Sequence, residues 1–214
     1  MAETRRTFTR DDPESRRADL VAAVLDLTAE AGPQGVTVRA IAERAGVTQG
    51  LIRHYFATKE ALIDAAYTAH MAAQTEAARA AAGPEADPPL DRLRRFIAAS
   101  LTPPVSDSRT ISLWAGFIHL IRRDPAMLAT HERSYLAFRD QLQALIVRAL
   151  AERDRLPGAD EARRLAIACN AVLDGLWFEA GALPDAFAPG EIVAIGSGAI
   201  GTILALPLAN EKER

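Results

Sequence analysis

The sequence predicts an all-α protein. Alanine, leucine and arginine dominate the chain, β-branched residues are scattered, and no alternating apolar and polar run of strand length occurs. Apolar residues recur instead at three- and four-residue intervals, as they do on one face of a helix. With 49% apolar and 25% charged residues over 214 positions, the composition is that of a globular protein with a substantial core.

The first predicted helix begins after Asp12, a suitable N-cap, with Pro13 at its first position. One face of this helix is formed by Leu20, Val21, Val24, Leu27, Thr28 and Ala31. We expect Gly32 to end the helix, because the GPQG sequence that starts there is typical of a turn.

Threonines mark the starts of the next three helices. Thr37 caps a short helix that ends before Gly46 and whose apolar face is formed by Val38, Ile41, Ala42 and Ala45. Thr48 caps a third helix of barely two turns. Thr58 then begins a long alanine-rich helix over 58–82.

The proline- and acid-rich sequence GPEADPP at 83–89 interrupts the helical pattern. Beyond it we expect five longer and more apolar helices, at 90–102, 107–123, 126–154, 160–182 and 190–206. We therefore divide the chain into an N-terminal part, residues 1–57, and a helical body, residues 58–214.

The charge balance argues against a protein that coats nucleic acid over its whole surface, because the net charge is −3. Residues 1–60 contain nine Arg or Lys and nine Asp or Glu. A DNA-binding face in this part of the chain therefore requires that basic and acidic side chains are segregated in space.

Several features predict a cytoplasmic protein without a membrane contact. The single cysteine, Cys169, suits a reducing compartment, and the polar N-terminal sequence is unlike a signal peptide. The uncharged run at 192–209 has the minimum length of a membrane span. Its three glycines, Ser197, Thr202 and Pro207 favour a buried terminal helix instead.

The segment from Thr37 to position 57 has the organisation of a helix-turn-helix unit, with the turn AGVT between two short helices. Its inward side is apolar and consists of Val38, Ile41, Val47, Ile52 and Phe56. The outer side presents Gln49, Gly50, Arg53 and His54. Gln pairs with adenine and Arg with guanine in the major groove, and glycine permits a close approach of the backbone. The alternative is a purely structural hairpin with a polar outer face.

The sequence TVRAIAERAGVTQGLIRHYFATKEALIDAAY resembles the DNA-binding signature of the tetracycline-repressor (TetR) family of bacterial regulators, most specifically in GVTxGxIxxYFxxKExL. The resemblance extends over residues about 16–67 and implies nine or ten helices: a three-helix head, a connecting fourth helix, and a body. It implies that residues 1–57 are the DNA-binding domain and that residues 58–214 are the ligand-binding and dimerisation domain. It implies phosphate contacts by Thr37, Tyr55 and Lys59. It also implies that a second group lies at or near the base edges, namely Arg39, Gln49, Gly50, Arg53 and His54. We add the helix cap Thr48 to the predicted DNA-binding residues.

Two shorter sequences, LIRHYF and LDGLWFEA at 173–180, are similar to those of the glycine-betaine-pathway repressor subgroup (BetI-like). Arg53 departs from the family pattern, because most relatives have an aromatic residue at this place. The base preference of a relative therefore cannot be transferred to this chain.

We find no catalytic or cofactor-binding pattern. The sequence GSGAIG at 196–201 has the spacing of a dinucleotide-binding loop, but only 13 residues follow it, too few for the required βαβ unit. Its glycines indicate close helix packing. The four histidines form no metal-spaced pair with an acid or with Cys169, which we expect to be a packed thiol. We expect no enzyme activity, no metal and no cofactor.

A stripe of large apolar side chains on the 107–123 helix and the next helix is a candidate ligand site. It consists of Trp114, Phe117, Ile118, Ile121, Met127 and Phe138. Such a stripe is more often plain core, but the family resemblance favours a cavity for a small, mostly apolar ligand. His119 is a candidate polar group in that cavity.

The 160–182 helix is apolar on most of its sides, so it needs a partner besides its own core. An identical helix across a two-fold axis would supply that partner, together with the preceding helix. The expected homodimer interface consists of Leu142, Leu145, Ile146, Ala149, Leu165, Cys169, Val172, Leu176 and Trp177.

These observations predict a homodimeric transcription regulator, a repressor that binds a palindromic operator and is released by a small molecule. The alternative is a helical small-molecule-binding or enzymatic protein with a vestigial helix-turn-helix. The ligand, the operator, the regulated gene, and the choice between repression and activation stay open at this point.

Overall fold

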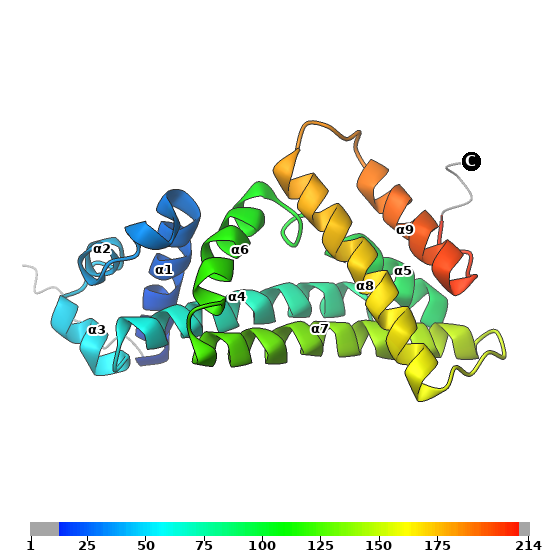
Figure 1. Ribbon diagram of the computed structural model, residues 1–214, viewed down its shortest axis with the longest axis horizontal. Coiled ribbons are helices and arrows are strands. Elements are labelled where there is room, and N and C mark those ends of the chain that lie inside the picture. The colour runs from blue at the N-terminus through cyan, green and yellow to red at the C-terminus, as the bar shows by residue number, and fades with distance from the viewer. Residues whose placement is uncertain (1–12, 210–214) are drawn as a thin grey trace, which may run out of the picture.

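The computed structural model describes residues 13–209, which form nine α-helices and no strand (Figure 1). This confirms the all-α prediction. Asp12, the predicted cap of the first helix, lies outside the described residues. The helices are α1 Pro13–Gly35, α2 Val38–Arg44, α3 Gln49–Tyr55, α4 Lys59–Ala81, α5 Pro89–Ser100, α6 Ser108–Ile121, α7 Pro125–Ala151, α8 Ala159–Ala182 and α9 Glu191–Leu204.

The first three helices lie together at one end of the molecule (Figure 1). Gly32 interrupts α1 with a φ of +67°, and one further turn follows as far as Gly35. The predicted helix end at Gly32 is therefore a break inside a longer element. Gly46 has a φ of +64°, which allows the chain to turn sharply from α2 into α3.

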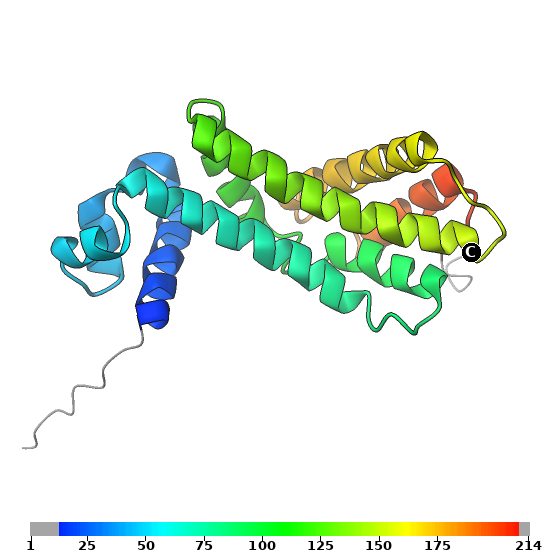
Figure 2. The same cartoon turned by 90° about the horizontal axis from the view of Figure 1, so that it is seen from below.

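The long helix α4 connects this end of the molecule to the rest of the chain. The Thr58 hydroxyl accepts a hydrogen bond from the N–H of Ala61 at 3.0 Å and so caps its first turn. From there α4 runs alongside α7, as both views show (Figures 1 and 2). The helix α7 ends at Ala151, earlier than predicted, because the chain adopts a left-handed conformation at Asp154 with a φ of +55°.

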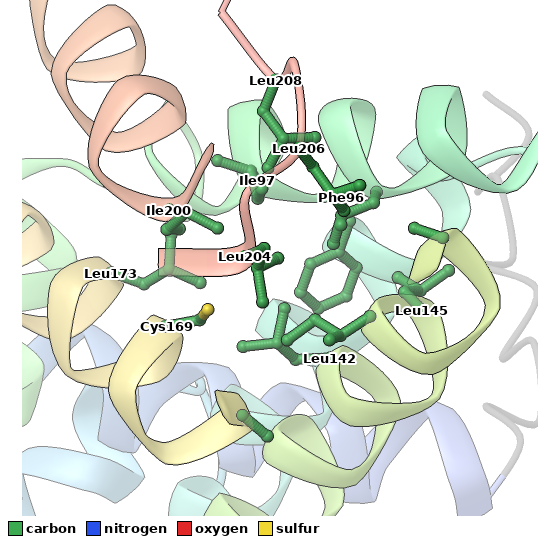
Figure 3. Close-up of a cluster of buried hydrophobic side chains, with 14 of the residues drawn as sticks. Phe96, Ile97, Leu142, Leu145, Cys169, Leu173, Ile200, Leu204, Leu206 and Leu208 are labelled. Atoms are coloured by element: carbon green, nitrogen blue, oxygen red, sulfur yellow. The ribbon is translucent and has the colours of Figure 1, made fainter. Parts of the chain in front are cut away.

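The core of the body lies between α5, α7, α8 and α9 (Figure 3). Phe96 of α5 and Cys169 of α8 are both fully buried in it. Leu206 and Leu208, which follow α9, fold back and are buried in the same cluster. Burial raises the pKa of the Cys169 thiol to about 12, as expected for a packed cysteine.

A second apolar cluster joins the three-helix head to the near end of the body. It combines residues of α1 to α4 with Leu113, Phe117 and Ile121 of α6 and Met127 of α7. Contact between α1 and α6 is close, because a Cβ on Gly116 would lie 2.6 Å from the Cγ2 of Thr28. The core of the head therefore continues across the predicted domain boundary at residues 57 and 58.

The sequence GSGAIG lies inside α9, where its glycines allow close packing. A Cβ on Gly196 would lie 2.4 Å from the Cδ1 of Leu101, and one on Gly201 would lie 2.8 Å from the carbonyl oxygen of Leu206. The uncharged run at 192–209 thus forms all of α9 after Glu191 and a following segment, whose Leu206 and Leu208 belong to the body core. Among the described residues, α8 is the one helix whose length and composition would suit a membrane span. It packs against α6, α7 and α9.

Candidate DNA-binding and ligand-binding sites

The helix-turn-helix geometry of α2 and α3 results from two threonine caps. The Thr37 hydroxyl accepts a hydrogen bond from the N–H of Ala40 at 3.1 Å, and the Thr48 hydroxyl accepts one from the N–H of Leu51 at 3.3 Å. Each cap satisfies a helix N–H that would otherwise lack an intrahelical partner. Together with the turn at Gly46, these caps determine where α3 begins and how it leaves α2.

The helix α3 has one buried side and one exposed side. Ile52 is buried in the cluster that joins the head to the body, and so is Phe56, which directly follows the helix. The predicted base-reading residues Gln49, Gly50, Arg53 and His54 are all exposed. A Cβ on Gly50 would meet only the hydroxyl of Thr48, at 3.9 Å, so packing within the chain does not require a glycine there.

The predicted phosphate-contacting residues are Thr37, Tyr55 and Lys59. Thr37 is exposed, as is Arg39 of the predicted base-edge group, and Tyr55 is half-buried. Lys59 donates a hydrogen bond from Nζ to the carbonyl of Val36 at 3.3 Å, which places its ammonium group beside the start of α2. The structure thus brings the whole predicted DNA-binding set to one end of the molecule.

Arg17 of α1 is a basic residue at this site that the sequence reasoning did not select. It donates a hydrogen bond to the Tyr55 carbonyl, at 3.4 Å, and its guanidinium lies 4.2 Å from the centre of the Phe56 ring. A cation at a helix C-terminus is favourable because it opposes the negative end of the helix dipole. Arg17 therefore anchors the end of α3 to α1.

A cavity of about 490 Å³ lies in the body between α4, α6, α7 and α8. Aromatic rings form much of its wall: Tyr67, Trp114, Tyr135, Phe138, Trp177 and Phe178. Trp114 lies edge-on to both Trp177 and Phe178, with ring centres 6.2 and 6.5 Å apart. The volume falls within the usual range for small-molecule sites.

Three of the six residues predicted to bind a ligand line this cavity, namely Trp114, Ile118 and Phe138. Phe117, Ile121 and Met127 do not; they are buried in the cluster that joins the head to the body. On α6, Trp114 and Ile118 form the stripe that lines the cavity, and Phe117 and Ile121 form the adjacent stripe that packs in the cluster with α1 and α4. His119 is exposed and does not line the cavity.

Asp174 contributes a carboxylate to the cavity wall. The Tyr135 hydroxyl donates a hydrogen bond to its Oδ2, and Asn170 Nδ2 donates to the same oxygen at 2.9 Å. Burial raises the pKa of Asp174 above its ordinary value, although both hydrogen bonds oppose this shift. Burial also raises the pKa of Tyr135 to about 12, so its hydroxyl remains a donor at neutral pH.

A second polar pair links α4 to α7 in the same wall. The Tyr67 hydroxyl and His131 Nδ1 lie 2.6 Å apart. Burial lowers the pKa of His131 and raises that of Tyr67, which favours a neutral imidazole whose Nδ1 accepts a hydrogen bond from the Tyr67 hydroxyl. Sequence reasoning missed Tyr67, His131, Tyr135 and Asp174. The available signal was the spacing of His131 and Tyr135, which share one face of α7.

Most of the residues predicted to form a dimer interface lie inside the chain instead. Five of them are at most 7% exposed and belong to the body core: Leu142, Leu145, Ile146, Ala149 and Cys169. Leu165, Val172 and Leu176 are partly buried against that core, and the Trp177 indole donates a hydrogen bond to the Val105 carbonyl at 2.7 Å. The apolarity of α8 is therefore largely explained by α6, α7 and α9 of the same chain.

A different apolar surface on α8 and α9 is exposed. It includes Phe178 near the end of α8, Leu183 directly after it, and Ile195 and Ile203 on α9, with exposed fractions of 50%, 53%, 45% and 37%. We call these four residues the α8–α9 face. Within residues 13–209, no three His, Cys, Asp or Glu side chains are grouped so that they could hold a metal ion.

Comparisons with known proteins agree with this architecture. Residues 20–66 match the family described as bacterial regulatory proteins, tetR family, and residues 89–205 match the BetI-type transcriptional repressor C-terminal family. The HTH-type transcriptional regulator BetI of Burkholderia thailandensis is 30% identical over 201 residues, which cover 92% of this chain and 91% of BetI.

Solved structures are similar over nearly the whole chain. A transcriptional regulator from Pseudomonas aeruginosa PAO1 is 31% identical, with a TM-score of 0.83 over 93% of this chain and 95% of the other. A regulator from Saccharomonospora viridis, solved in complex with choline, has a TM-score of 0.72 at 18% identity and covers 87% of this chain and 96% of the other. The latter likeness concerns the fold.

Proposed function

Because the chain belongs to the tetR family of bacterial regulatory proteins and has a BetI-type C-terminal part, we propose that it binds a palindromic operator as a homodimer and releases it when a small molecule occupies the aromatic cavity. The family is one of transcriptional regulators rather than enzymes, as the sequence predicted.

The observation that carries the DNA-binding role is the exposed side of α3. Gln49, Arg53 and His54 project from a helix whose opposite side is held by Ile52 in the head core. This arrangement suits a recognition helix that enters the major groove, with Arg53 reading a guanine and Gln49 an adenine. Gly50, which the chain itself does not require, leaves room for the close approach of the duplex.

We place the dimer contact on the α8–α9 face. Four large apolar side chains exposed on two neighbouring helices would be covered by the same face of a second copy. A two-fold dimer presents its recognition helices to half-sites about 34–36 Å apart or a multiple of this distance. Footprinting of operator fragments selected from random duplex DNA is expected to give an inverted repeat; an asymmetric site occupied by one chain would contradict the dimer.

The cavity wall supports an organic cation with apolar substituents as the ligand, which refines the mostly apolar ligand expected from the sequence. Aromatic faces attract quaternary ammonium groups, and Asp174 adds a carboxylate, the one acidic side chain among the described residues of the wall. The related regulator from Saccharomonospora viridis was solved with choline, which belongs to this chemical class. Choline is therefore the first compound to test.

Two contacts connect the cavity to the head. Tyr67 of α4 belongs to the cavity wall and also touches Phe117, with ring centres 5.1 Å apart in the head–body cluster. Arg109 of α6 donates a hydrogen bond to Asp26 of α1 at 2.6 Å, directly before Thr110 of the cavity wall. A ligand that prefers a shifted position of α4 or α6 would change the spacing of the two heads. A typical coupling of about 1–3 kcal/mol would weaken operator binding 5- to 150-fold.

The ligand class can be tested with choline and its uncharged analogue 3,3-dimethylbutan-1-ol. Both tryptophans of the chain line the cavity, so intrinsic fluorescence reports binding there. We expect choline to bind at least about tenfold more tightly than the alcohol, and Asp174→Asn to reduce this difference. The control Asp140→Asn changes an exposed residue of α7 and should leave the difference intact. Equal binding of both compounds would refute the cationic ligand.

Induction has a separate test. Operator DNA must weaken ligand binding by the same factor by which the ligand weakens operator binding. Titration of choline with and without the selected operator is expected to show this loss of affinity. Equal affinities in the two titrations would contradict induction by this ligand while leaving the DNA-binding role intact.

A further inference from the structure

A second cavity, of about 330 Å³, lies in the body far from the head, between the end of α4, the following loop, α5 and α7. Figures 1 and 2 show these elements at the end of α4 opposite to the helix-turn-helix. None of its lining residues belongs to the aromatic cavity. The proposed function therefore does not account for it.

Arg92 of α5 lines this second cavity and is an unusual residue. It is 9% exposed, and its Nε is buried without a hydrogen-bond partner among the described residues. No ion pair to Arg92 is present in residues 13–209. Its neighbours on α5 differ, since Arg94 pairs with Asp91 and Arg95 pairs with Asp87. A largely buried guanidinium without a counter-charge is costly, so an anion in the cavity would stabilise Arg92.

A second unpartnered polar atom lines the same cavity. The Oε1 of Gln141, on α7, is buried without a hydrogen-bond partner within the described chain. The cavity therefore combines a donor on Arg92 with an acceptor on Gln141. Buried polar atoms in folded proteins are almost always satisfied, so one group that accepts from Arg92 and donates to Gln141 would satisfy both.

The other charged groups of the wall are paired. Arg79 forms an ion pair with Glu76 at 2.6 Å and Arg148 pairs with Glu85, so Arg92 is the one charged side chain of the wall without a counter-charge among the described residues. Glu85 is well exposed and pairs only with Arg148, at 3.4 Å, so it competes weakly for Arg92. The buried ring of Phe96 forms an apolar part of the wall.

We propose that this cavity binds a small anion that also carries a hydrogen-bond donor, as hydroxycarboxylates and protonated phosphates do. The anionic oxygens accept hydrogen bonds from the Arg92 guanidinium, whose charge is unpaired, whereas Arg79 and Arg148 of the same wall keep their carboxylate partners. The hydroxyl group donates to Gln141, and the carbon skeleton of a carboxylate packs against Phe96. This site is separate from the proposed ligand cavity and from the DNA-binding surface.

Calorimetric titration of the full-length protein at low ionic strength tests the proposal with three probes. Malate carries a hydroxyl donor, succinate is the same dicarboxylate without it, and inorganic phosphate represents the phosphate class. We expect one saturable site per chain that prefers malate to succinate, and the phosphate titration distinguishes the two anion classes. Tryptophan emission should stay unchanged, because both tryptophans lie in the other cavity.

Two variants separate the contributions. Arg92→Met removes the charge at nearly constant volume and should weaken the preferred anion about tenfold or more, whereas folding should persist because apolar replacement of a buried charge is tolerated. Gln141→Leu should abolish the preference for malate over succinate. The control Arg133→Met removes a guanidinium on α7 that does not line this cavity. It should change neither the affinity for the preferred anion nor the preference for malate.

Two results would overturn the proposal. One is the absence of saturable binding of all three probes to the unmodified protein, since solvent alone would then satisfy Arg92 and Gln141. The other is equal binding to the unmodified protein and to Arg92→Met. Because neither result involves operator DNA or choline, failure here is independent of the function proposed above.

Discussion

Replacement of Phe117 by alanine distinguishes the position predicted from the sequence from the position in the structure. The sequence places Phe117 in a ligand cavity, where its loss would reduce ligand affinity. In the structure Phe117 is 0% exposed and its ring meets that of Tyr67 at 5.1 Å, with an interplanar angle of 61°. It packs in the cluster that joins the head to the body.

The expected cost follows from this burial. Phe→Ala at a fully buried position typically destabilises a protein by about 3–5 kcal/mol, because the apolar transfer energy is lost and a cavity remains. The edge-to-face contact with Tyr67 favours the upper part of this range, since such ring pairs add about 0.5–1.5 kcal/mol. For a chain of this length, a loss of about 4 kcal/mol corresponds to a decrease in Tm of about 8–16 °C.

Urea and thermal unfolding followed by circular dichroism would measure this loss, at one fixed protein concentration because dimerisation also contributes to stability. Leu136→Ala, on the exposed side of α7, is the control and should cost less than about 0.5 kcal/mol. A loss below about 1 kcal/mol for Phe117→Ala, together with lost choline binding, would refute the structural placement and restore the one predicted from the sequence.

Two further predictions concern DNA recognition and pH. Arg53→Ala should cost about 1–3 kcal/mol of operator-binding energy and relax the preference at one base position. Lys59→Ala should weaken binding to all DNA sequences alike and lower the slope of log affinity against log salt concentration by about one. Equal losses of specificity in the two variants would contradict these roles. Burial, aided by Arg109 and opposed by Asp107, lowers the pKa of His70 to about 4, below its unfolded value of 6.5. The free energy of unfolding should therefore be highest above about pH 6.5 and fall between pH 6.5 and 4. Urea titrations over this pH range would measure the decrease. If a His70→Gln variant shows the same decrease, His70 is not its cause.

The start of each helix in the head could be predicted from local sequence. Thr37, Thr48 and Thr58 each accept the expected hydrogen bond from the N–H three residues later. Gly46 has the expected positive φ. These features depend on residues within one turn of each other, so the sequence contains all of the physical information that they require.

The ligand cavity was predicted less completely, for a geometric reason. Trp114 and Phe117 are three residues apart on α6, and the apolar pattern alone does not tell which of them faces another helix and which faces empty space. Their separation is decided by α1, which packs on the Phe117 side, and by α8, which leaves a gap on the Trp114 side. The polar residues Tyr135 and Asp174 come from two helices, and no sequence spacing relates them.

The predicted dimer interface differs from the exposed surface of the structure for a similar geometric reason. An apolar helix needs partners on most of its sides, and the sequence correctly identifies α8 as such a helix. It cannot tell whether a partner belongs to the same chain or to another. In the structure α7 and α9 bury Cys169 and Leu173 within the chain, whereas the side chains of the α8–α9 face stay exposed.

By itself, the sequence determined the helical class, the helix caps, the turn of the helix-turn-helix and the exposed polar side of α3, because these depend on local backbone preferences and on periodicity. Only the tertiary structure decided which apolar stripes close into a core, which leave a cavity, and which polar residues from distant helices meet, such as Tyr135 with Asp174. The physical reason is that burial and desolvation are set by the packing of all helices together, whereas a side chain's neighbours along the chain are the same in every fold.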